Sequence, residues 1–372
     1  MKNPFSKIIY LSFLAFTFSN CTKEKTISIN LDSEIVSPKS YVVYKTATPL
    51  IIDGKANEKD WKQAKFTSNF IDIEGVKIPN QQTNVKMLWD DEFLYVYAKL
   101  NEEHIWGDIK VRDQVIFYNN DFEVFISPSN DTHNYGEIEI NALGTVWDLV
   151  LNKPYNVGGK PKNRWNLNGL KSAVSIQGTL NNPNDIDEYW SVEMAIPLSA
   201  FAELKNRPKV KPKDGEQWRI NFSRVQWDHD IIDRVYSRKI ENNKFSPEYN
   251  WVWSNQGAIN MHLPENWGYI HFTDNNTNSP IIFKHQTDVL TEQITYALYR
   301  NIAFKKLNYL KQKEPGFQIE FEPIKIKQET INASFLKTHT GFTIQTKNSK
   351  KNSTYAISET GLIQRKKNNT KN

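Results

Sequence analysis

The chain has 372 residues, of which 39% are hydrophobic, and it carries 47 Lys and Arg against 42 Asp and Glu. The positive excess lies in the two ends of the chain, so the body is close to neutral, which argues against a nucleic-acid surface and predicts no nucleic-acid partner. The single cysteine, Cys21, excludes intrachain disulfides and zinc–thiolate clusters.

Residues 1–20 are typical of a lipoprotein-type signal peptide. Their apolar run, Ile8–Phe18, is about 16 Å long as a helix and too short for a bilayer core of about 30 Å. Because Cys21 follows directly, we expect lipidation there and a cell-envelope location, on the periplasmic or surface side of a membrane such as the outer membrane. A cleaved signal with a chance cysteine is the alternative. Residues 21–40 are polar and predict a tether.

Residues 41–275 alternate between apolar and polar side chains, with turn signals every ten to fifteen residues. This pattern predicts a mainly β fold, an antiparallel β-sandwich of about nine or ten strands. A short helix is expected near residues 57–64 and a helical turn near 199–204. The expected strands are 84–88, 93–100, 121–126, 136–142, 146–151, 172–180, 189–196, 217–226 and 267–272.

Residues 278–365 differ in composition and predict a C-terminal α+β extension. Apolar residues recur at helical spacing through residues 287–312, up to the Pro315-Gly316 pair, which predicts one amphipathic helix. Short strands are expected beyond it. Residues 366–372 predict a disordered tail.

Two neighbouring sandwich strands carry a polar face. In a strand, alternate side chains point to opposite sides. In residues 121–126, Phe122, Val124 and Ile126 therefore oppose Asp121, Glu123 and Phe125. In residues 136–142, Ile138 and Ile140 oppose Glu137, Glu139 and Asn141. One sheet face is expected to carry carboxylates and an amide.

Seven phrases follow one another along residues 46–272. They are IIDGKANEKDWKQA, VKMLWDDEFLYVYAKL, RDQVIFYNNDFEVFISP, YGEIEINALGTVWDL, YWSVEMAIP, WRINFSRVQW, and WVWS followed by LPENWGYIHF. Together they resemble the family 9 carbohydrate-binding modules, within the broader DOMON-like group. The resemblance implies a β-sandwich that binds sugars between aromatic rings, often with structural calcium.

The candidate sugar-binding residues combine this resemblance with the polar face. Aromatic rings cover the C–H faces of a sugar, and charged or amide groups bind its hydroxyls. Where the family places tryptophans, this chain has Phe117 and either Met261 or His262, and where the family has an arginine it has Glu139, so the ligand identity does not carry over. The candidates are Arg112, Asp113, Phe117, Tyr118, Glu123, Glu139, Asn141, Trp147, Arg224, Trp251 and Trp253.

We therefore expect a non-catalytic carbohydrate-binding protein that serves polysaccharide catabolism, with a saccharide ligand and a separate glycan-degrading enzyme as partners. The first alternative is a glycoside hydrolase that uses a carboxylate pair such as Glu123 and Glu139. The second is a haem-binding DOMON-like protein with a ligand among Met87, Met194 and Met261. Asp228 and Asp230 are candidate calcium ligands, against the alternative of a solvated loop.

Overall fold

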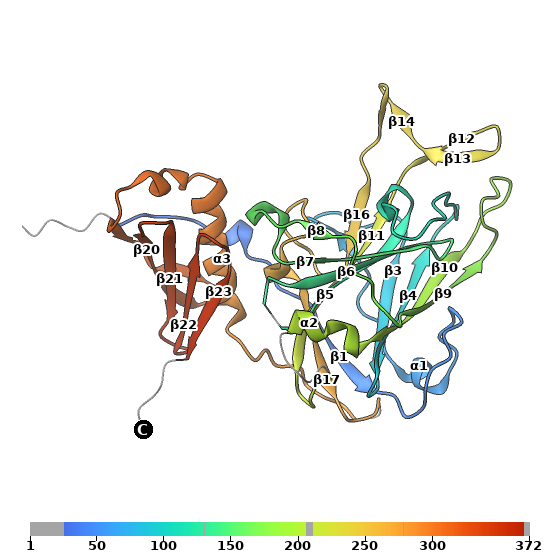
Figure 1. Cartoon of the computed structure of the whole chain (residues 1–372), viewed down its shortest axis with the longest axis horizontal. Helices are drawn as coiled ribbons and strands as arrows, with labels where there is room; N and C mark the ends of the chain where they lie inside the picture. Colours follow the sequence, from blue (N-terminus) through green and yellow to red (C-terminus); the bar gives the residue numbers. More distant parts are fainter. Residues whose placement is uncertain (1–25, 130, 206–210, 278, 368–372) are drawn as a thin grey trace, which may run out of the picture.

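The larger part of the chain is a curled β-sheet that wraps around a hydrophobic core (Figure 1). The computed structural model describes residues 26–129, 131–205, 211–277 and 279–367. The strands follow the order β8-β7-β6-β5-β11-β17-β1-β3-β4-β10-β9, with β16 beside β11 and β2 beside β16. Their bounds are β1 Ser40–Lys45, β2 Ile71–Asp72, β3 Thr83–Trp89, β4 Phe93–Asn101, β5 Asp121–Ser127, β6 Tyr135–Asn141, β7 Val146–Leu151, β8 Pro161–Lys162, β9 Lys171–Gln177, β10 Tyr189–Pro197, β11 Gln217–Gln226, β16 Tyr249–Val252 and β17 Gly268–Thr273.

Short helices and two small hairpins decorate this sheet. The hairpins β12–β13 and β14–β15 project from it beyond β16 (Figure 1). The strands are β12 His229–Ile232, β13 Val235–Arg238, β14 Ile240–Glu241 and β15 Lys244–Phe245, and the helices are α1 Lys59–Gln63, α2 Ala202–Lys205, η1 Asp32–Glu34, η2 Ile116–Tyr118, η3 Tyr155–Val157, η4 Leu198–Phe201 and η5 Pro264–Asn266. No helix among the described residues is long and apolar enough to cross a membrane.

The predicted mainly β, sandwich-like fold is confirmed, but the expectation that it is wholly antiparallel is wrong at β1. This strand pairs in parallel with β17 on one side and with β3 on the other. It thereby joins the β5–β11–β17 half of the sheet to the β3–β4–β10 half. An alternating pattern specifies which side chains are buried but not strand direction, so the sequence carried no signal for this parallel seam.

The core fills the space between the two halves of the sheet. Apolar side chains from β5, β6 and β11 meet those from β3, β4 and β10 in one cluster. Trp89, Trp190, Trp218 and Trp253 are all fully buried there. Most of the tryptophans thus stabilise the sandwich by burial of apolar area.

The C-terminal part has a second core, between a helix and a separate antiparallel sheet. The helix ends at Phe304, where Lys305 leaves helical geometry, so the single helix predicted for 287–312 is shorter and a separate 3-10 turn follows. The sheet order is β18-β20-β21-β22-β23, with β19 beside β20. The bounds are α3 Val289–Phe304, η6 Asn308–Gln312, β18 Gln318–Glu320, β19 Ile324–Ile326, β20 Glu329–Lys337, β21 Phe342–Asn348, β22 Ser353–Ser358 and β23 Ile363–Lys367.

The segment before β1 packs on this C-terminal part, so the tether predicted for residues 21–40 is wrong over its described residues, 26–40. Ile27 forms a parallel bridge with Phe321, and Leu31 is buried in the second core. Glu34 accepts a hydrogen bond from the Asn301 side chain at 2.7 Å. Apolar residues spaced through an otherwise polar segment were enough to dock it.

The predictions for the two chain ends concern residues that the structure describes only in part. The predicted signal peptide and Cys21 lie outside the described residues, as do residues 368–372. Residues 366 and 367, placed in the predicted tail, continue strand β23.

A buried charge network joins the sandwich to the C-terminal part. The Arg219 guanidinium on β11 forms an ion pair with Glu292 on α3, and both side chains are almost completely buried. Arg365 on β23 approaches the same carboxylate at 3.2 Å. Removing one partner of such a pair leaves a buried charge uncompensated, so the fold depends on Glu292.

We expect Glu292→Ala to lower the free energy of unfolding by about 3 to 5 kcal/mol, because Arg219 would remain buried without its carboxylate. Urea unfolding followed by circular dichroism measures this loss. The control is Glu241→Ala, which removes an exposed ion pair with Lys239 and should change the stability much less than Glu292→Ala does. Equal effects of the two variants would contradict the role given to Glu292.

Candidate functional site

A cavity of about 200 Å³ lies against the outer face of the sheet formed by β5, β6 and β7. Its lining side chains come from these strands, from η2 and η3, from β11 and β16, and from the loop before η5. They include Phe117, Glu123, Phe125, Glu137, Glu139, Trp147, Tyr155, Glu248, Asn250, Met261 and His262. We call this cavity the acidic pocket.

Strand alternation and register bring the carboxylates to this pocket. On β5 and β6, the apolar side chains enter the core cluster and the acidic ones point to the opposite side. The register sets Asp121 opposite Asn141 and Glu123 opposite Glu139. Neighbouring side chains across an antiparallel pair are close enough to interact directly.

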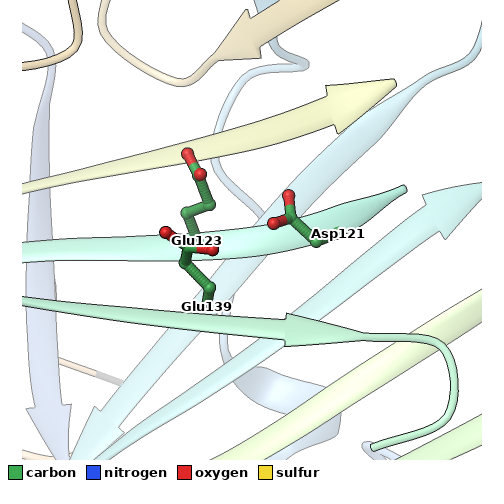
Figure 2. A group of neighbouring side chains, drawn as sticks. All are labelled: Asp121, Glu123 and Glu139. Atoms are coloured by element: carbon green, nitrogen blue, oxygen red, sulfur yellow. The ribbon is translucent and has the colours of Figure 1, made fainter. Parts of the chain in front are cut away.

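Three of these carboxylates form a tight group (Figure 2). Asp121, Glu123 and Glu139 each offer an oxygen that lies within 4.8 Å of the others, and all three side chains are buried. The Asp121 carboxylate accepts a hydrogen bond from the backbone N–H of Val225 at 3.2 Å. The Glu139 carboxylate accepts one from the backbone N–H of Phe117 at 3.1 Å. Among the described residues, no Lys, Arg or His forms an ion pair with the group.

Burial and mutual repulsion favour the protonated forms. Burial raises the pKa of Asp121 and of Glu139 well above the ordinary range, and the negative charge of Glu123 adds to both shifts. Burial also raises the pKa of Glu123 to about 7, with a smaller contribution from Glu248. The neighbouring Glu137 is raised well above its ordinary value for the same reasons. At neutral pH the group therefore retains protons unless positive charge is supplied.

Aromatic rings form the other walls of the pocket. Phe117 and Trp147 lie beside the carboxylates, and Tyr155, with 43% of its surface exposed, stands at the edge. The Tyr155 ring meets the His262 ring edge to face, with centroids 4.5 Å apart. Burial lowers the pKa of His262 to about 4, so this imidazole is neutral. The pocket thus combines acidic groups with apolar faces.

Four of the predicted site residues line this pocket, namely Phe117, Glu123, Glu139 and Trp147. Tyr118 lies next to Phe117 but contacts the Arg238 guanidinium, 4.6 Å from its ring centroid. Asn141 is fully buried, and its side-chain amide forms hydrogen bonds with Ile109, Asn119, Leu143 and Thr145. It shapes the loops around the pocket.

The structure places Arg112 and Asp113 outside the lining of the pocket. The Arg112 guanidinium pairs with Asp148 and approaches Asp113 at 3.6 Å. Asp113 has a φ of 64° and forms part of a turn. Both residues hold the loop before η2 against β7.

The predictions for Arg224, Trp251 and Trp253 are corrected. Alternation along β11 puts Arg224 on the same side as Ile220 and Phe222, which is the core side. Its guanidinium is fully buried and pairs with Glu102 at 2.5 Å. Trp251 and Trp253 belong to the same core, and the Trp253 ring packs on Gly268, where a Cβ would lie 2.3 Å from it.

The predicted calcium ligands also have other partners. Asp230 accepts a hydrogen bond from the backbone N–H of Ile240, and Asp228 accepts one from the Tyr249 hydroxyl. Neither belongs to a group of three possible ligands in the described ranges, where Asp121, Glu123 and Glu139 form the group found.

The three methionines considered as haem ligands lie in two different places. Met87 and Met194 are fully buried in the core, and Met261 lines the acidic pocket.

Sequence reasoning missed several lining residues. Glu137 could have been chosen from the same alternation as Glu139, since the two share one face of β6. The resemblance pointed to Met261 and His262 as positions of a family tryptophan, and both line the pocket. Tyr155 begins the short turn η3 and Glu248 lies in the loop before β16, and neither position has a local sequence signal.

We expect the protein to lose stability as the pH rises from about 4.5 to about 7 in buffer with a chelator. Below the unfolded pKa, Glu123 is protonated in both states, and above the folded pKa the native state must hold an ionised buried carboxylate. The contribution of Glu123 is about 3 kcal/mol. Urea unfolding at both pH values measures it.

Glu123→Gln should reduce this loss, and Glu241→Gln, at an exposed position, should leave it unchanged. Asp121, Glu137 and Glu139 change stability in the same direction, so part of the slope should persist in Glu123→Gln. Stability that rises over this pH window would refute the assignment.

Comparison with known proteins finds a family that resembles part of this chain. Residues 52–230 match the family model described as "Carbohydrate family 9 binding domain-like". No curated protein matches the chain.

Solved structures align over about two thirds of the chain. A family 9 carbohydrate-binding module from Caldicellulosiruptor kristjanssonii, in complex with cellotriose, is 15% identical, covers 66% of this chain and 100% of its own, and has a TM-score of 0.42. A structure of a family 9 module from the same organism in complex with glucose is also 15% identical, covers 66% of this chain and 100% of its own, and has a TM-score of 0.41. A proposed carbohydrate-binding protein from Bacteroides uniformis is 19% identical, with 63% and 100% coverage and a TM-score of 0.46. Residues 52–230 of the chain are thus similar to the carbohydrate family 9 binding domain-like family.

Proposed function

We propose that the protein binds saccharides without catalysis, in the acidic pocket. The observation that carries this proposal is the meeting of aromatic rings and carboxylates in one cavity on the family domain. Rings such as Trp147 and Tyr155 offer apolar faces to the C–H groups of a sugar. Carboxylates such as Glu123 and Glu139 accept hydrogen bonds from its hydroxyls.

The size of the pocket favours a short ligand. Its volume of about 200 Å³ lies below the 300 to 1,000 Å³ that is usual for drug-sized ligands. A single sugar ring, free or at the end of a chain, is the ligand that suits it. The rest of a longer saccharide would extend past Tyr155 into solvent.

We also propose a cellular setting for this binding. Lipidation at Cys21 would hold the domain at the cell envelope, where it would retain saccharides for a separate glycan-degrading enzyme in polysaccharide catabolism. The support is the sequence pattern before Cys21 together with the family of the domain. Mass spectrometry of the membrane fraction, with Cys21→Ser as the control, tests the lipid.

We expect calorimetry with a panel of mono- and oligosaccharides to find saturable binding that weakens at least about tenfold in Tyr155→Ala, a loss of about 1.4 kcal/mol. The lost ring is the apolar face at the pocket edge. The matched control is Tyr309→Ala, since Tyr309 is similarly exposed at 48% but lies in η6. A folded protein that binds no saccharide would refute the proposal.

A glycoside hydrolase is the second candidate, and the closeness of Glu123 and Glu139 favours it. Retaining glycosidases place two carboxyl groups about 5 to 5.5 Å apart and raise the pKa of one of them. The oxygens of this pair lie within 4.8 Å, and the pKa of Glu123 is raised to about 7. Product release from a chromogenic glycoside that is lost in Glu123→Gln would establish this activity in place of simple binding.

A further inference from the structure

We propose that Asp121, Glu123 and Glu139 bind a divalent cation of the calcium class at the floor of the acidic pocket. These three carboxylates come from two adjacent strands and lie close together (Figure 2). The proposed ion is distinct from any calcium at Asp228, just before the β12–β13 hairpin, and Asp230, on β12.

The spacing of the carboxylates fits one ion. Calcium binds carboxylate oxygens at about 2.3 to 2.6 Å, so two oxygens on the same ion lie at most about 5 Å apart. One oxygen from each of the three groups lies within 4.8 Å of the other two. A small closure around the ion would complete the coordination without a change of strand register.

Unpartnered oxygens give a second, independent indication. Oε2 of Glu137, a fourth carboxylate that lines the pocket and is 5% exposed, has no hydrogen-bond partner in the described part of the chain. The same holds for Oδ2 of the fully buried Asp121. A buried acceptor without a donor is costly. A cation held by Asp121, Glu123 and Glu139 would satisfy the Asp121 oxygen, where an apolar ligand would not.

The side chains around the pocket also carry an excess of acidic groups. Glu123 faces it from β5, Glu137 and Glu139 from β6, and Glu248 from the loop before β16. Asp121 lies beside Glu123 and Glu139, behind this lining. His262 lines the opposite wall as a neutral imidazole. Either protons or a bound cation can neutralise these carboxylates. When the protons leave, a bound cation is what supplies the positive charge.

The donor set selects the class of ion. Oxygen ligands alone suit calcium, which accepts six to eight of them in flexible geometry, whereas magnesium demands near-ideal octahedral geometry at shorter distances. Three carboxylates leave coordination positions that point into the pocket. Water would fill them in the free protein. This last step rests on the proposed function: two hydroxyls of a bound sugar would replace that water.

The test begins with the metal alone, in the purified full chain freed of metal by chelation. Calcium titrated at about pH 8 should bind saturably by calorimetry and raise the melting temperature. Terbium should bind competitively and luminesce on tryptophan excitation, since Trp147 lines the same pocket. The affinity should fall at least tenfold at about pH 5, because protons compete for the same oxygens.

Variants locate the ion. Asp121→Asn and Glu139→Gln should each weaken calcium at least tenfold while the folded protein gains stability in chelator, because each removes a buried ionisable group. Asp230→Asn is the matched control and should leave the affinity unchanged. A folded wild-type chain that binds neither calcium nor terbium would overturn the proposal. So would binding that survives both pocket variants or is lost in Asp230→Asn.

A sugar titration separates this inference from the proposed function. Saccharide that binds only with calcium present supports the direct role of the ion. Saccharide binding that is equal in calcium and in chelator would refute the coordination of sugar by the ion and leave the carbohydrate function intact. Calcium binding without any saccharide binding would refute the carbohydrate function and leave the metal site intact.

Discussion

The register between β5 and β6 is the constraint on which the acidic pocket depends. Phe122, Val124, Ile126, Ile138 and Ile140 are fully buried on one side of these strands. Each contributes about 1.5 to 3 kcal/mol by burial, which together exceeds the cost of holding a few carboxylates close on the other side. A slip of one residue would exchange the two faces. The core therefore fixes the positions of the acidic groups.

Much of the fold could be predicted because it is encoded by local alternation. The hairpin of β3 and β4 and the acidic face of β5 and β6 follow directly from period-two patterns. Arg224 could not be placed in the same way, because its partner Glu102 is 122 residues distant along the chain. A long polar side chain on a core-facing position can be buried if such a partner exists, and alternation gives no information on partners. Tyr155 reaches the pocket from the short turn η3 and Glu248 from a loop, and the paths of both depend on tertiary packing.

One substitution relative to the family resemblance changes the chemistry of the site. An arginine at the position of Glu139 would give Glu123 a permanent counter-charge. With Glu139 there, β5 and β6 present like charges across one register position. Burial raises the pKa of both groups, and the charge of Glu123 raises the pKa of Glu139 further.

The buried pairing of Arg219 with Glu292 also bears on modularity. Binding modules are often moved between proteins as self-sufficient units, which requires that no buried charge be balanced from outside. Here the sandwich supplies Arg219 and Glu265, and the C-terminal helix supplies their partners Glu292 and Arg300. A chain cut before α3 would lack Glu292 and Arg300. Arg219 and Glu265 would then be exposed to solvent or buried without these counter-charges. The sandwich and the C-terminal part are therefore coupled through buried charges that neither part balances by itself.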